Sequence, residues 1–390
     1  MKLAIVGVGQ AGGKVLDRLL EYDVTRNTGF VSHAIAVNSA KPDLMGLDHV
    51  PQENRLLVGS AVVSGHGTGT DPEVGAQCVR EDLHEIVNAV GRTATSQIDA
   101  FLVIAGLGGG TGSGGAPVVA ERLKEIYAEP VYGLGILPAP DEGGIYSRNA
   151  ANALQRFVSK TDSLLLFDNG AARNSGETLS EGYAEINEEI ATRFGMLFSA
   201  GEIDALGDDV AESVVDSSEI INTLGDRGIT SIGYASEAIQ PTESSGGLLS
   251  RFLGSSDEPD ISSMGEATNR ITSLVRRATL GTLTLPCERD SASRALLIVS
   301  GPPDKLSRKG IDEARSWLEE TTECRTVRAG DYPLPNEDRV AVLVVLSGVT
   351  GAPRIKRMQE QAVESEEVVA EREETSESDM QDLIEYDNDG

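Results

Sequence analysis

The first 170 residues alternate between short apolar runs and longer amphipathic segments, and this alternation limits the folds that are open to the chain. The apolar runs have the length and composition of buried strands; they are Leu3–Val6, Ala34–Val37, Leu56–Val58, Phe101–Ala105, Val131–Leu137 and Leu164–Phe167. Helical spacing lies between several of them, at Gly13–Tyr22, Glu73–Val90, Ala116–Ala128 and Tyr146–Lys160. The pattern predicts a doubly wound parallel sheet, an α/β fold in which ligands bind where strands end and helices begin.

A long helix is predicted to connect this part of the chain to a second, smaller α/β domain. Its apolar spacing runs through Leu179–Phe198, and strands and helices follow it, at Ile229–Ala235, Met264–Leu280, Ala295–Ser300, Leu306–Glu320, Arg325–Ala329 and Val340–Leu346. Gln240–Ser263 is rich in Ser, Gly, Pro and acids, which is typical of a long mobile loop. The expected divisions are an N-terminal domain, a central helix, a C-terminal domain and an acidic disordered tail, at residues 1–177, 178–202, 203–353 and 354–390.

The formal net charge of −29 argues against binding to nucleic acid or to anionic membranes, because both need a basic surface. Only eight of the 33 basic residues are lysine. Many carboxylates with little lysine suit a protein that stays soluble in concentrated salt, where screening reduces self-repulsion. We therefore expect that the protein works in the high-salt cytoplasm of a salt-loving organism. A protein that stayed folded and monomeric at low ionic strength would count against this expectation.

Three features of the sequence bear on location and covalent chemistry. Cys78, Cys287 and Cys324 lie far apart without a CxxC pair, so neither a disulfide framework nor a metal site is predicted. A strand begins within the first residues, with no charged and apolar leader before it, and no apolar run is long enough to span a membrane. We expect a cytoplasmic protein.

Met380–Tyr386 places a few apolar residues within the acidic tail and is a candidate peptide for docking a partner.

A glycine-rich stretch directly follows the apolar run that ends at Leu107. Residues 108–115 read Gly-Gly-Gly-Thr-Gly-Ser-Gly-Gly and lead into the helical spacing of Ala116–Ala128. Glycine leaves backbone N–H groups open to a ligand, and a helix N-terminus adds a partial positive charge. The order of strand, glycine loop and helix therefore favours phosphate binding over a merely flexible turn.

Two further glycine-bearing loops belong to the same predicted sheet. Gly7–Gly12 has the GxGxxG spacing of dinucleotide enzymes, but the second strand ends at Asn38 without the acid that holds a ribose 2′-hydroxyl. Walker A spacing is absent as well, since Lys14 is not followed by Ser or Thr. With the loop Gly65–Pro72, three loops favour a nucleoside triphosphate. An NAD(P)-dependent oxidoreductase is the alternative, supported by Gly7–Gly12 alone.

Gly108–Gly114 resembles the signature loop of the tubulin/FtsZ GTPases, and the resemblance runs from residue 1 to about residue 350. Gly9–Gly13 is similar to the first nucleotide loop of that family, and Thr68–Gly75 is similar to the FtsZ loop that senses the γ-phosphate. Asp168-Asn169 resembles the tubulin turn that contacts ribose and base. With the acidity and the tail, these features most resemble CetZ, the haloarchaeal branch of the family.

The resemblance implies a GTP or GDP site in the N-terminal domain, with Mg²⁺ held mainly by the nucleotide and no protein metal ligands. Tyr183 and Asn187 match the positions that stack on guanine and hydrogen-bond to it, and Glu142 matches a ribose contact. Arg148 lies six residues after Glu142 where FtsZ has an arginine at four, so it is given no role. The residues implied to bind nucleotide are Gly9, Gln10, Ala11, Gly12, Gly13, Lys14, Asn38, Thr68, Gly69, Thr70, Gly108, Gly109, Gly110, Thr111, Gly112, Glu142, Asn169, Tyr183 and Asn187.

The resemblance also implies that the group activating the attacking water comes from the next subunit. FtsZ presents an Asp-x-x-Asp pair there, and Asp216 and Glu219 occupy the matching positions on one face of a helix N-terminus. Val214 stands where FtsZ has an asparagine, so this loop departs from the FtsZ pattern. In so acidic a chain, helix capping or simple solvation also accounts for both acids.

The family resemblance implies a cytoskeletal GTPase that polymerises head to tail with copies of itself, and CetZ proteins are associated with cell shape and motility. The domain at 203–353 would then serve activation and polymerisation. A non-hydrolysing filament that only senses GTP is the third interpretation. Nucleotide carried through purification distinguishes guanine from nicotinamide, and steady-state phosphate release distinguishes an enzyme from a sensor.

Overall fold

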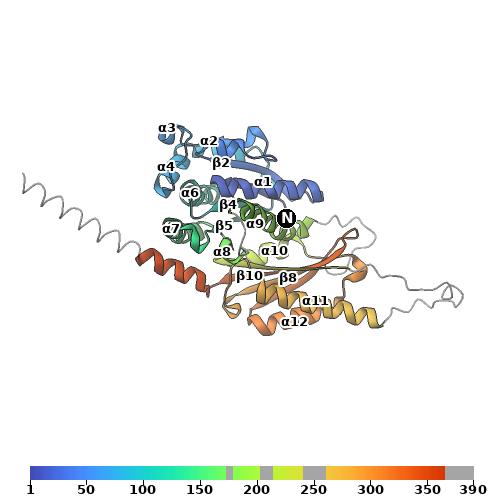
Figure 1. Cartoon of the computed structure of the whole chain (residues 1–390). Helices are drawn as coiled ribbons and strands as arrows, with labels where there is room; N and C mark the ends of the chain where they lie inside the picture. Colours follow the sequence, from blue (N-terminus) through green and yellow to red (C-terminus); the bar gives the residue numbers. More distant parts are fainter. Residues whose placement is uncertain (173–178, 203–213, 240–260, 365–390) are drawn as a thin grey trace, which may run out of the picture.

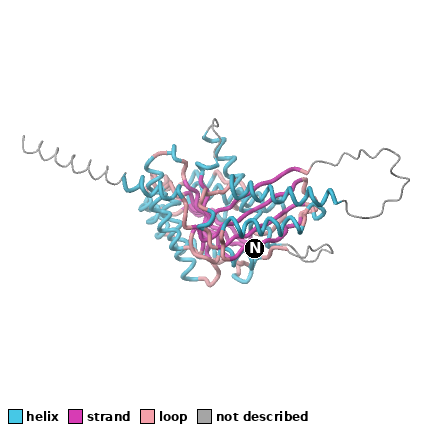
Figure 2. The backbone as a smooth tube through the Cα atoms, turned by 90° about the horizontal axis from the view of Figure 1, so that it is seen from below, coloured by secondary structure: helices cyan, strands magenta, loops and turns pink. Residues whose placement is uncertain are grey.

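The computed structural model describes residues 1–172, 179–202, 214–239 and 261–364, and its strands form a continuous sheet through the centre of the molecule (Figures 1 and 2). The strand order is β3-β2-β1-β4-β5-β6-β7-β10-β8-β9. The strands are β1 (Leu3–Val8), β2 (Val31–Asn38), β3 (Arg55–Leu57), β4 (Ala100–Gly106), β5 (Val131–Leu137), β6 (Ser163–Asp168), β7 (Ile229–Ala238), β8 (Arg294–Gly301), β9 (Thr326–Pro333) and β10 (Arg339–Val349). Every apolar run predicted as a strand overlaps one of them.

Helices cover both faces of this sheet, as the alternating sequence pattern predicts. The longer ones are α1 (Gly9–Arg26), α4 (Pro72–Glu81), α5 (Leu83–Val90), α6 (Gly110–Ile126), α7 (Gly144–Lys160), α9 (Leu179–Ser199), α10 (Ser217–Leu224), α11 (Ile261–Gly281) and α12 (Arg308–Thr322). Short helices and 3₁₀ turns are α2 (Lys41–Met45), α3 (Ser60–Val63), α8 (Asn169–Ala172), η1 (Gln52–Asn54), η2 (Thr95–Gln97), η3 (Pro140–Glu142), η4 (Ala200–Glu202), η6 (Arg289–Ser291) and η7 (Pro303–Lys305).

In the sheet order, the strands from β3 through β2, β1, β4, β5 and β6 to β7 are parallel to their neighbours. Alternate residues of each buried strand pack into different cores. In β1, Leu3 and Ile5 pack with α1 and α9, whereas Ala4 and Val6 pack with α4 and α6. Burial on both faces explains why these strands read as continuous apolar runs rather than as an alternating pattern. This layering confirms the doubly wound α/β fold of the N-terminal half.

The two halves of the chain share the sheet rather than forming separate ones. Strand β7 pairs with β6 at Ile229 and Thr230, and the remaining strands continue outward from it. In this second half β10 is antiparallel to both β7 and β8. Figure 1 shows α11 and α12 along one face of β8 and β10 and α10 on the other. The second α/β unit therefore continues the sheet from β6, the last strand of the first.

Two predicted helix boundaries are wrong. The helix expected from Ala116 begins six residues earlier, so most of the glycine-rich stretch is the first turns of α6 rather than a loop. The segment Glu73–Val90 is two helices, α4 and α5, separated at Asp82. The glycines after Gly109 look like a loop in the sequence, because their low helix propensity conceals a helix that is stabilised by tight packing.

The disordered tail expected from residue 354 is also wrong at its start. Residues 353–364 are helical, and Ile355, Met358 and Ala362 are buried in the core of the N-terminal domain. The rest of the tail, with the candidate docking peptide Met380–Tyr386, lies outside the described residues. Most of the loop predicted at Gln240–Ser263 also lies outside them, while its last residues belong to α11.

Candidate functional site

A cavity of about 990 Å³ opens at the carboxyl ends of the parallel strands. Residues at or just beyond the ends of β1, β2, β4, β5 and β6 line it, at Gly9, Asn38, Gly108, Pro138 and Asn169. The strand order reverses between β1 and β4, and this reversal separates the loops that follow them. The cavity therefore occupies the place where an open parallel sheet ordinarily binds its ligand.

Two helix N-termini, those of α1 and α6, open into this cavity. Neither Val8 nor Gly109, their N-cap residues, makes a side-chain capping hydrogen bond. By contrast, Asp71 caps α4 by accepting hydrogen bonds from the N–H groups of Glu73 and Val74. The first N–H groups of α1 and α6 thus have no capping side chain, and their partial positive charges suit a phosphate chain between them.

The glycines of this wall are required by close backbone approach. Gly9 has φ of +75°, and a Cβ there would lie 2.8 Å from the nitrogen of Gly112. A Cβ on Gly110 would lie 2.0 Å from Oγ1 of Thr68. Gly109, in contrast, has no neighbour within 4 Å of its Cβ position. The three loops thus pack against one another while the backbone at Gly109 stays open.

The cavity brings together seventeen of the nineteen residues that the sequence predicted to bind nucleotide. They are Gly9, Gln10, Ala11, Lys14, Asn38, Thr68, Gly69, Thr70, Gly108, Gly109, Gly110, Thr111, Gly112, Glu142, Asn169, Tyr183 and Asn187. They come from loops and helices spread over the first half of the chain, which only the folded sheet places together.

Gly12 and Gly13, which were also predicted to bind nucleotide, are not among the residues that line the cavity. Both are buried in α1, and a Cβ on Gly12 would lie 2.3 Å from the carbonyl oxygen of Ile104. A Cβ on Gly13 would meet only the methyl groups of Leu47, at 3.7 Å. Gly12 is therefore small because α1 packs directly on β4.

Replacing Gly12 by alanine is expected to destabilise the protein by about 1–3 kcal/mol, because the added methyl overlaps the backbone of β4. Gly13→Ala is the matched control on the same helix and should be tolerated. Urea unfolding at fixed salt measures both. Equal stabilities for the two variants would contradict the packing role of Gly12.

One end of the cavity carries the groups expected to contact ribose and base. Nδ2 of Asn169 lies 3.5 Å from Oε1 of Glu142, which also accepts a hydrogen bond from the N–H of Ala139 at 2.7 Å. Oδ1 of Asn169 is buried and has no hydrogen-bond partner among the described residues. A buried acceptor of this kind needs a donor, and the hydroxyl or N–H groups of a nucleoside supply donors. Asn187 and Tyr183 of α9 line the same cavity.

Several polar residues that shape the cavity were missed by the sequence analysis. Asn149 is buried in α7, and its Nδ2 donates to the carbonyls of Thr70 at 2.8 Å and Gly108 at 3.1 Å, which ties two of the loops together. Asp43 lies 3.0 Å from Nδ2 of Asn38. No local motif marks such residues, because their partners lie far away in the sequence. Arg148, left without a role, lines a neighbouring pocket instead.

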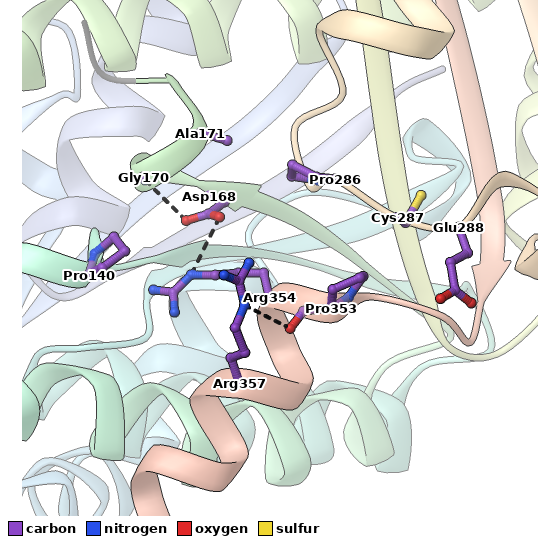
Figure 3. Close-up of a pocket in the computed structure, with 10 residues that line it drawn as sticks. All are labelled: Pro140, Asp168, Gly170, Ala171, Pro286, Cys287, Glu288, Pro353, Arg354 and Arg357. Carbon is purple, nitrogen blue, oxygen red and sulfur yellow. Dashed lines mark hydrogen bonds and ion pairs between the residues drawn. The ribbon is translucent and has the colours of Figure 1, made fainter. Parts of the chain in front are cut away.

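A smaller pocket of about 380 Å³ lies beneath the turn at Asp168-Asn169 (Figure 3). In it, Asp168 pairs with Arg354 of the helical segment 353–364, with Nε and Oδ2 3.5 Å apart. Both side chains are buried, at 5% and 8% exposure. Arg354 also donates to the carbonyl of Pro138 at 2.9 Å, and Asp168 accepts from the N–H of Gly170 at 3.0 Å. This ion pair joins the end of the described chain to the turn at the edge of the large cavity.

Burial raises the pKa of Asp168 above its usual value, and the Arg354 guanidinium opposes that rise. The pair is therefore a desolvated one whose partners depend on each other. Figure 3 shows Asp168 and Arg354 facing one another across the pocket, with Pro140 beside them. The carboxylate adjoins Asn169 in the sequence, so this contact fixes the turn that contacts the expected ribose and base.

The predicted acid pair lies elsewhere, at the N-terminus of α10. Asp216 is exposed and caps the helix, since its Oδ1 accepts hydrogen bonds from the N–H of Glu219 at 2.8 Å and from Oγ of Ser218 at 2.6 Å. These hydrogen bonds hold the pKa of Asp216 below its usual value. Burial, with the nearby Asp216 charge, raises the pKa of Glu219, and Arg328 opposes this rise. Capping thus explains Asp216 but not the raised pKa of Glu219.

Helix α9 separates the two halves of the predicted site. Tyr183 and Asn187 line the cavity near its N-terminal end, while η4 follows its last residue and contacts α10 through Ser217, whose Oγ donates to the carbonyl of Gly201 at 3.2 Å. A helix of 21 residues is about 30 Å long. Asp216 and Glu219 do not line the cavity, so the acids and the cavity cannot act together within one subunit.

Comparison with known proteins agrees with this arrangement. Residues 2–177 match the family model for the tubulin/FtsZ family GTPase domain, and residues 176–364 match the model for the tubulin-like CetZ C-terminal domain. The chain is 56% identical to the tubulin-like protein CetZ1 of Haloferax volcanii over 372 residues, which covers 95% of this chain and 94% of that protein.

Solved structures give the same result. The structure described as a GDP-bound monomer of CetZ1 from Haloferax volcanii has a TM-score of 0.82 at 52% identity, covering 94% of this chain and 100% of the other. The structure described as a GTPγS-bound protofilament of CetZ2 from the same organism has a TM-score of 0.83 at 40% identity, covering 95% of this chain and 100% of the other.

The fold, the cavity and these matches define a GTPase of the tubulin/FtsZ class. Within that class the C-terminal half identifies the branch of the family. The GTPase-domain model covers tubulin and FtsZ alike, whereas residues 176–364 match the model for the C-terminal domain of CetZ. The chain belongs to the tubulin-like CetZ family. This assignment excludes the dinucleotide oxidoreductase as an interpretation, and it confirms the resemblance that the glycine-rich stretch indicated.

Two further observations limit the chemistry of the described residues. Among them, no group of three or more His, Cys, Asp or Glu is arranged to hold a metal ion. Cys78, Cys287 and Cys324 are free, and burial raises the pKa of the Cys287 thiol to about 11. No helix in the described part of the chain combines the length and the apolar character needed to cross a membrane.

Proposed function

We propose that the cavity binds GTP with its triphosphate between the N-termini of α1 and α6. The observation that supports this best is the pair of helix N-termini without capping side chains at one end of the cavity, with the unpartnered Oδ1 of Asn169 at the other. The first suits a phosphate chain and the second suits a nucleoside. Structures of the relatives contain GDP or GTPγS by their descriptions, which supports guanine as the base.

Mg²⁺ would be held mainly by the phosphate oxygens of GTP. Hydroxyl groups of Thr68, Thr70 and Thr111 are the oxygen donors of this part of the cavity, and Thr111 is also within 2.7 Å of Ser39. A divalent cation keeping most of its ligands from water and phosphate fits such a sparse donor set. Its chemical contribution is to neutralise charge on the β- and γ-phosphate oxygens.

In the proposed polymer, subunits join head to tail and each α10 faces the nucleotide cavity of its neighbour. Glu219 of one subunit then polarises the water that attacks the γ-phosphate bound by the other, while the loops position the phosphates. The separation of cavity and acids along α9 supports this shared site. The relative described as a GTPγS-bound protofilament supports self-association of this kind.

The cellular role that fits this chemistry is a cytoplasmic cytoskeletal filament that controls cell shape, with motility as a dependent function. The net charge of −29 suits the concentrated salt of a haloarchaeal cytoplasm. Partner docking through Met380–Tyr386 stays a sequence-based hypothesis.

Phosphate release measured over a wide range of protein concentration tests the shared site. We expect turnover per subunit to be low in dilute protein and to rise steeply where pelleting detects filaments, because only assembled subunits complete the site. Turnover per subunit that stays constant across that range would overturn the proposal. GTP binding without any phosphate release, even in filaments, would favour the sensor interpretation instead.

Asp216 gives a second test, because its two possible roles respond differently to substitution. Asp216→Asn keeps an N-cap acceptor but removes the charge, whereas Asp216→Ala removes both and should cost about 1 kcal/mol of stability. If Asp216 only caps α10, the asparagine variant should unfold and turn over GTP like the unaltered protein. If it also contributes charge to catalysis, turnover should fall while stability is kept. Urea unfolding and phosphate release separate these results.

A further inference from the structure

Glu219 is contacted by an arginine that the sequence analysis did not single out. Nη1 of Arg328, on strand β9, lies 3.5 Å from Oε1 of Glu219. The two residues are far apart in the sequence, and they meet because the loop before α10 runs along β9. There, the N–H of Val215 donates to the carbonyl of Asp331 at 3.3 Å, and Val214 forms a bridge with the same residue.

The alternation of β9 determines which way Arg328 points. Val327 and Ala329 pack into the core beneath α11 and α12, while Tyr332 packs into the opposite core with Ile220 of α10. Because side chains alternate along a strand, Arg328 lies on the same face as Tyr332, the face that α10 covers. The strand thus determines the face on which the Arg328 side chain lies, and this face brings it close to Glu219.

Two other charged side chains of the described residues near α10 are paired with other groups. On β8, Arg294 pairs with Asp226 at 2.7 Å. In η4, Glu202 pairs with Lys2 and with the N-terminal ammonium. Of the charged side chains on the described elements that pack against α10, Arg328 and Asp216 are therefore the two that act on Glu219, and they act in opposite directions.

Glu219 is less exposed than its partner, with 27% of its side chain accessible against 38% for Arg328. The N–H of Glu219 donates to Asp216, which fixes its backbone but leaves its carboxylate free to rotate about the side-chain bonds. The ion pair with Arg328 provides a charge contact to that carboxylate. A carboxylate must be both ionised and correctly aimed to polarise a water.

We propose that Arg328 is the positioning residue of the hydrolytic site, holding the Glu219 carboxylate ionised and directed toward the nucleotide of the adjoining subunit. The inference rests on the proposed role of Glu219. Arg328 itself need not touch GTP, and its effect reaches the reaction only through the carboxylate. The contact between Arg328 and Glu219 therefore belongs to the part of the shared hydrolytic site that each subunit contributes to the cavity of its neighbour.

Arg328→Gln, Arg328→Lys and Arg325→Gln test this proposal in the full-length chain. Arg325 is exposed, and its replacement removes the same charge three residues away. We expect Arg328→Gln to lower GTP turnover in filaments on the order of tenfold, with KM for GTP unchanged, since misaligned groups lose rate rather than binding. Arg328→Lys should recover a substantial part of the rate, and Arg325→Gln should match the unaltered protein.

The pH profile of turnover supplies a readout that a merely structural role would not move. Arg328 favours the charged form of Glu219, so its loss should raise the pKa of that carboxyl further. The acidic limb of the profile should then shift to higher pH in Arg328→Gln and return in Arg328→Lys. In a Glu219→Gln background, Arg328→Gln should have no further effect, because the group it positions is gone.

A normal rate and an unshifted acidic limb in Arg328→Gln filaments would overturn the inference, as would equal losses in the glutamine and lysine variants. Filament pelleting identifies any loss that comes from failed assembly, and such a loss would also count against a positioning role. If Glu219→Gln keeps full turnover, the proposed catalytic site itself fails. If Glu219→Gln is inactive and Arg328→Gln is not, only the present inference fails.

Discussion

Glu219→Ala is expected to lower GTP turnover in filaments by at least about 100-fold, the contribution typical of a positioned proton acceptor. Filaments should still assemble with GTP, because the cavity proposed to bind the nucleotide does not include Glu219 and keeps all its residues. Without hydrolysis they should also persist after assembly. Phosphate release and sedimentation, measured on the same samples at high salt, check both parts.

The matched control for this experiment is Glu320→Ala, an exposed glutamate on α12, on the opposite face of the sheet from α10. It removes the same charge and should leave turnover unchanged. Normal turnover in Glu219→Ala filaments would show that another group activates the water. Loss of assembly in Glu219→Ala but not in Glu320→Ala would instead mean that Glu219 forms part of the subunit contact.

Arg354→Met is expected to destabilise the folded chain by about 3–5 kcal/mol, the usual effect of leaving one member of a buried ion pair without its partner. Asp168 would then be a buried carboxylate without the opposing guanidinium, beside the turn that carries Asn169. We therefore also expect weaker guanine nucleotide binding. Urea unfolding at fixed salt measures the first effect, and equilibrium binding of GDP measures the second.

Arg357→Met is the control for Arg354→Met. Arg357 belongs to the same helical segment and its charge also acts on Asp168, but it is exposed, so its loss should have a much smaller effect on stability. The double variant Asp168→Asn/Arg354→Met should be more stable than Arg354→Met, because the stranded charge is removed as well. A single variant as stable as the Arg357 control would show that this contact does not join the helical segment to the nucleotide-binding domain.

The sequence predicts the strands and most helices well, because burial on both faces leaves continuous apolar runs such as Val131–Leu137, whose bounds match β5. It misplaces the start of α6, since local propensity treats Gly110–Gly115 as a loop and takes no account of the packing of α4 against them. It also takes residue 354 as the start of a disordered tail. The apolar residues Ile355 and Met358 are few among the acids, and their burial depends on a distant core.

In the candidate site, too, residues with a local sequence pattern are predicted and residues that depend on distant partners are not. Glycine loops have a local signature, so Gly9 and Gly108 are identified without a structure. Asn149 and Arg328 have none, because each acts through partners that are remote in the sequence. Gly12 shows a further limit of motifs, since its place in one suggests a ligand contact and gives no sign of the close packing on Ile104 that also requires a small residue there.

Helix α9 has a consequence for any polymer built from this chain. Because the nucleotide cavity and the acids lie at its opposite ends, the two tips of a proposed filament differ chemically. One tip presents bound nucleotide that no neighbouring Glu219 can reach, and the other presents carboxylates with no substrate. In this proposed filament, the last nucleotide at the first tip would be spared from hydrolysis until another subunit arrives. Growth itself, rather than elapsed time, would start the reaction at each junction.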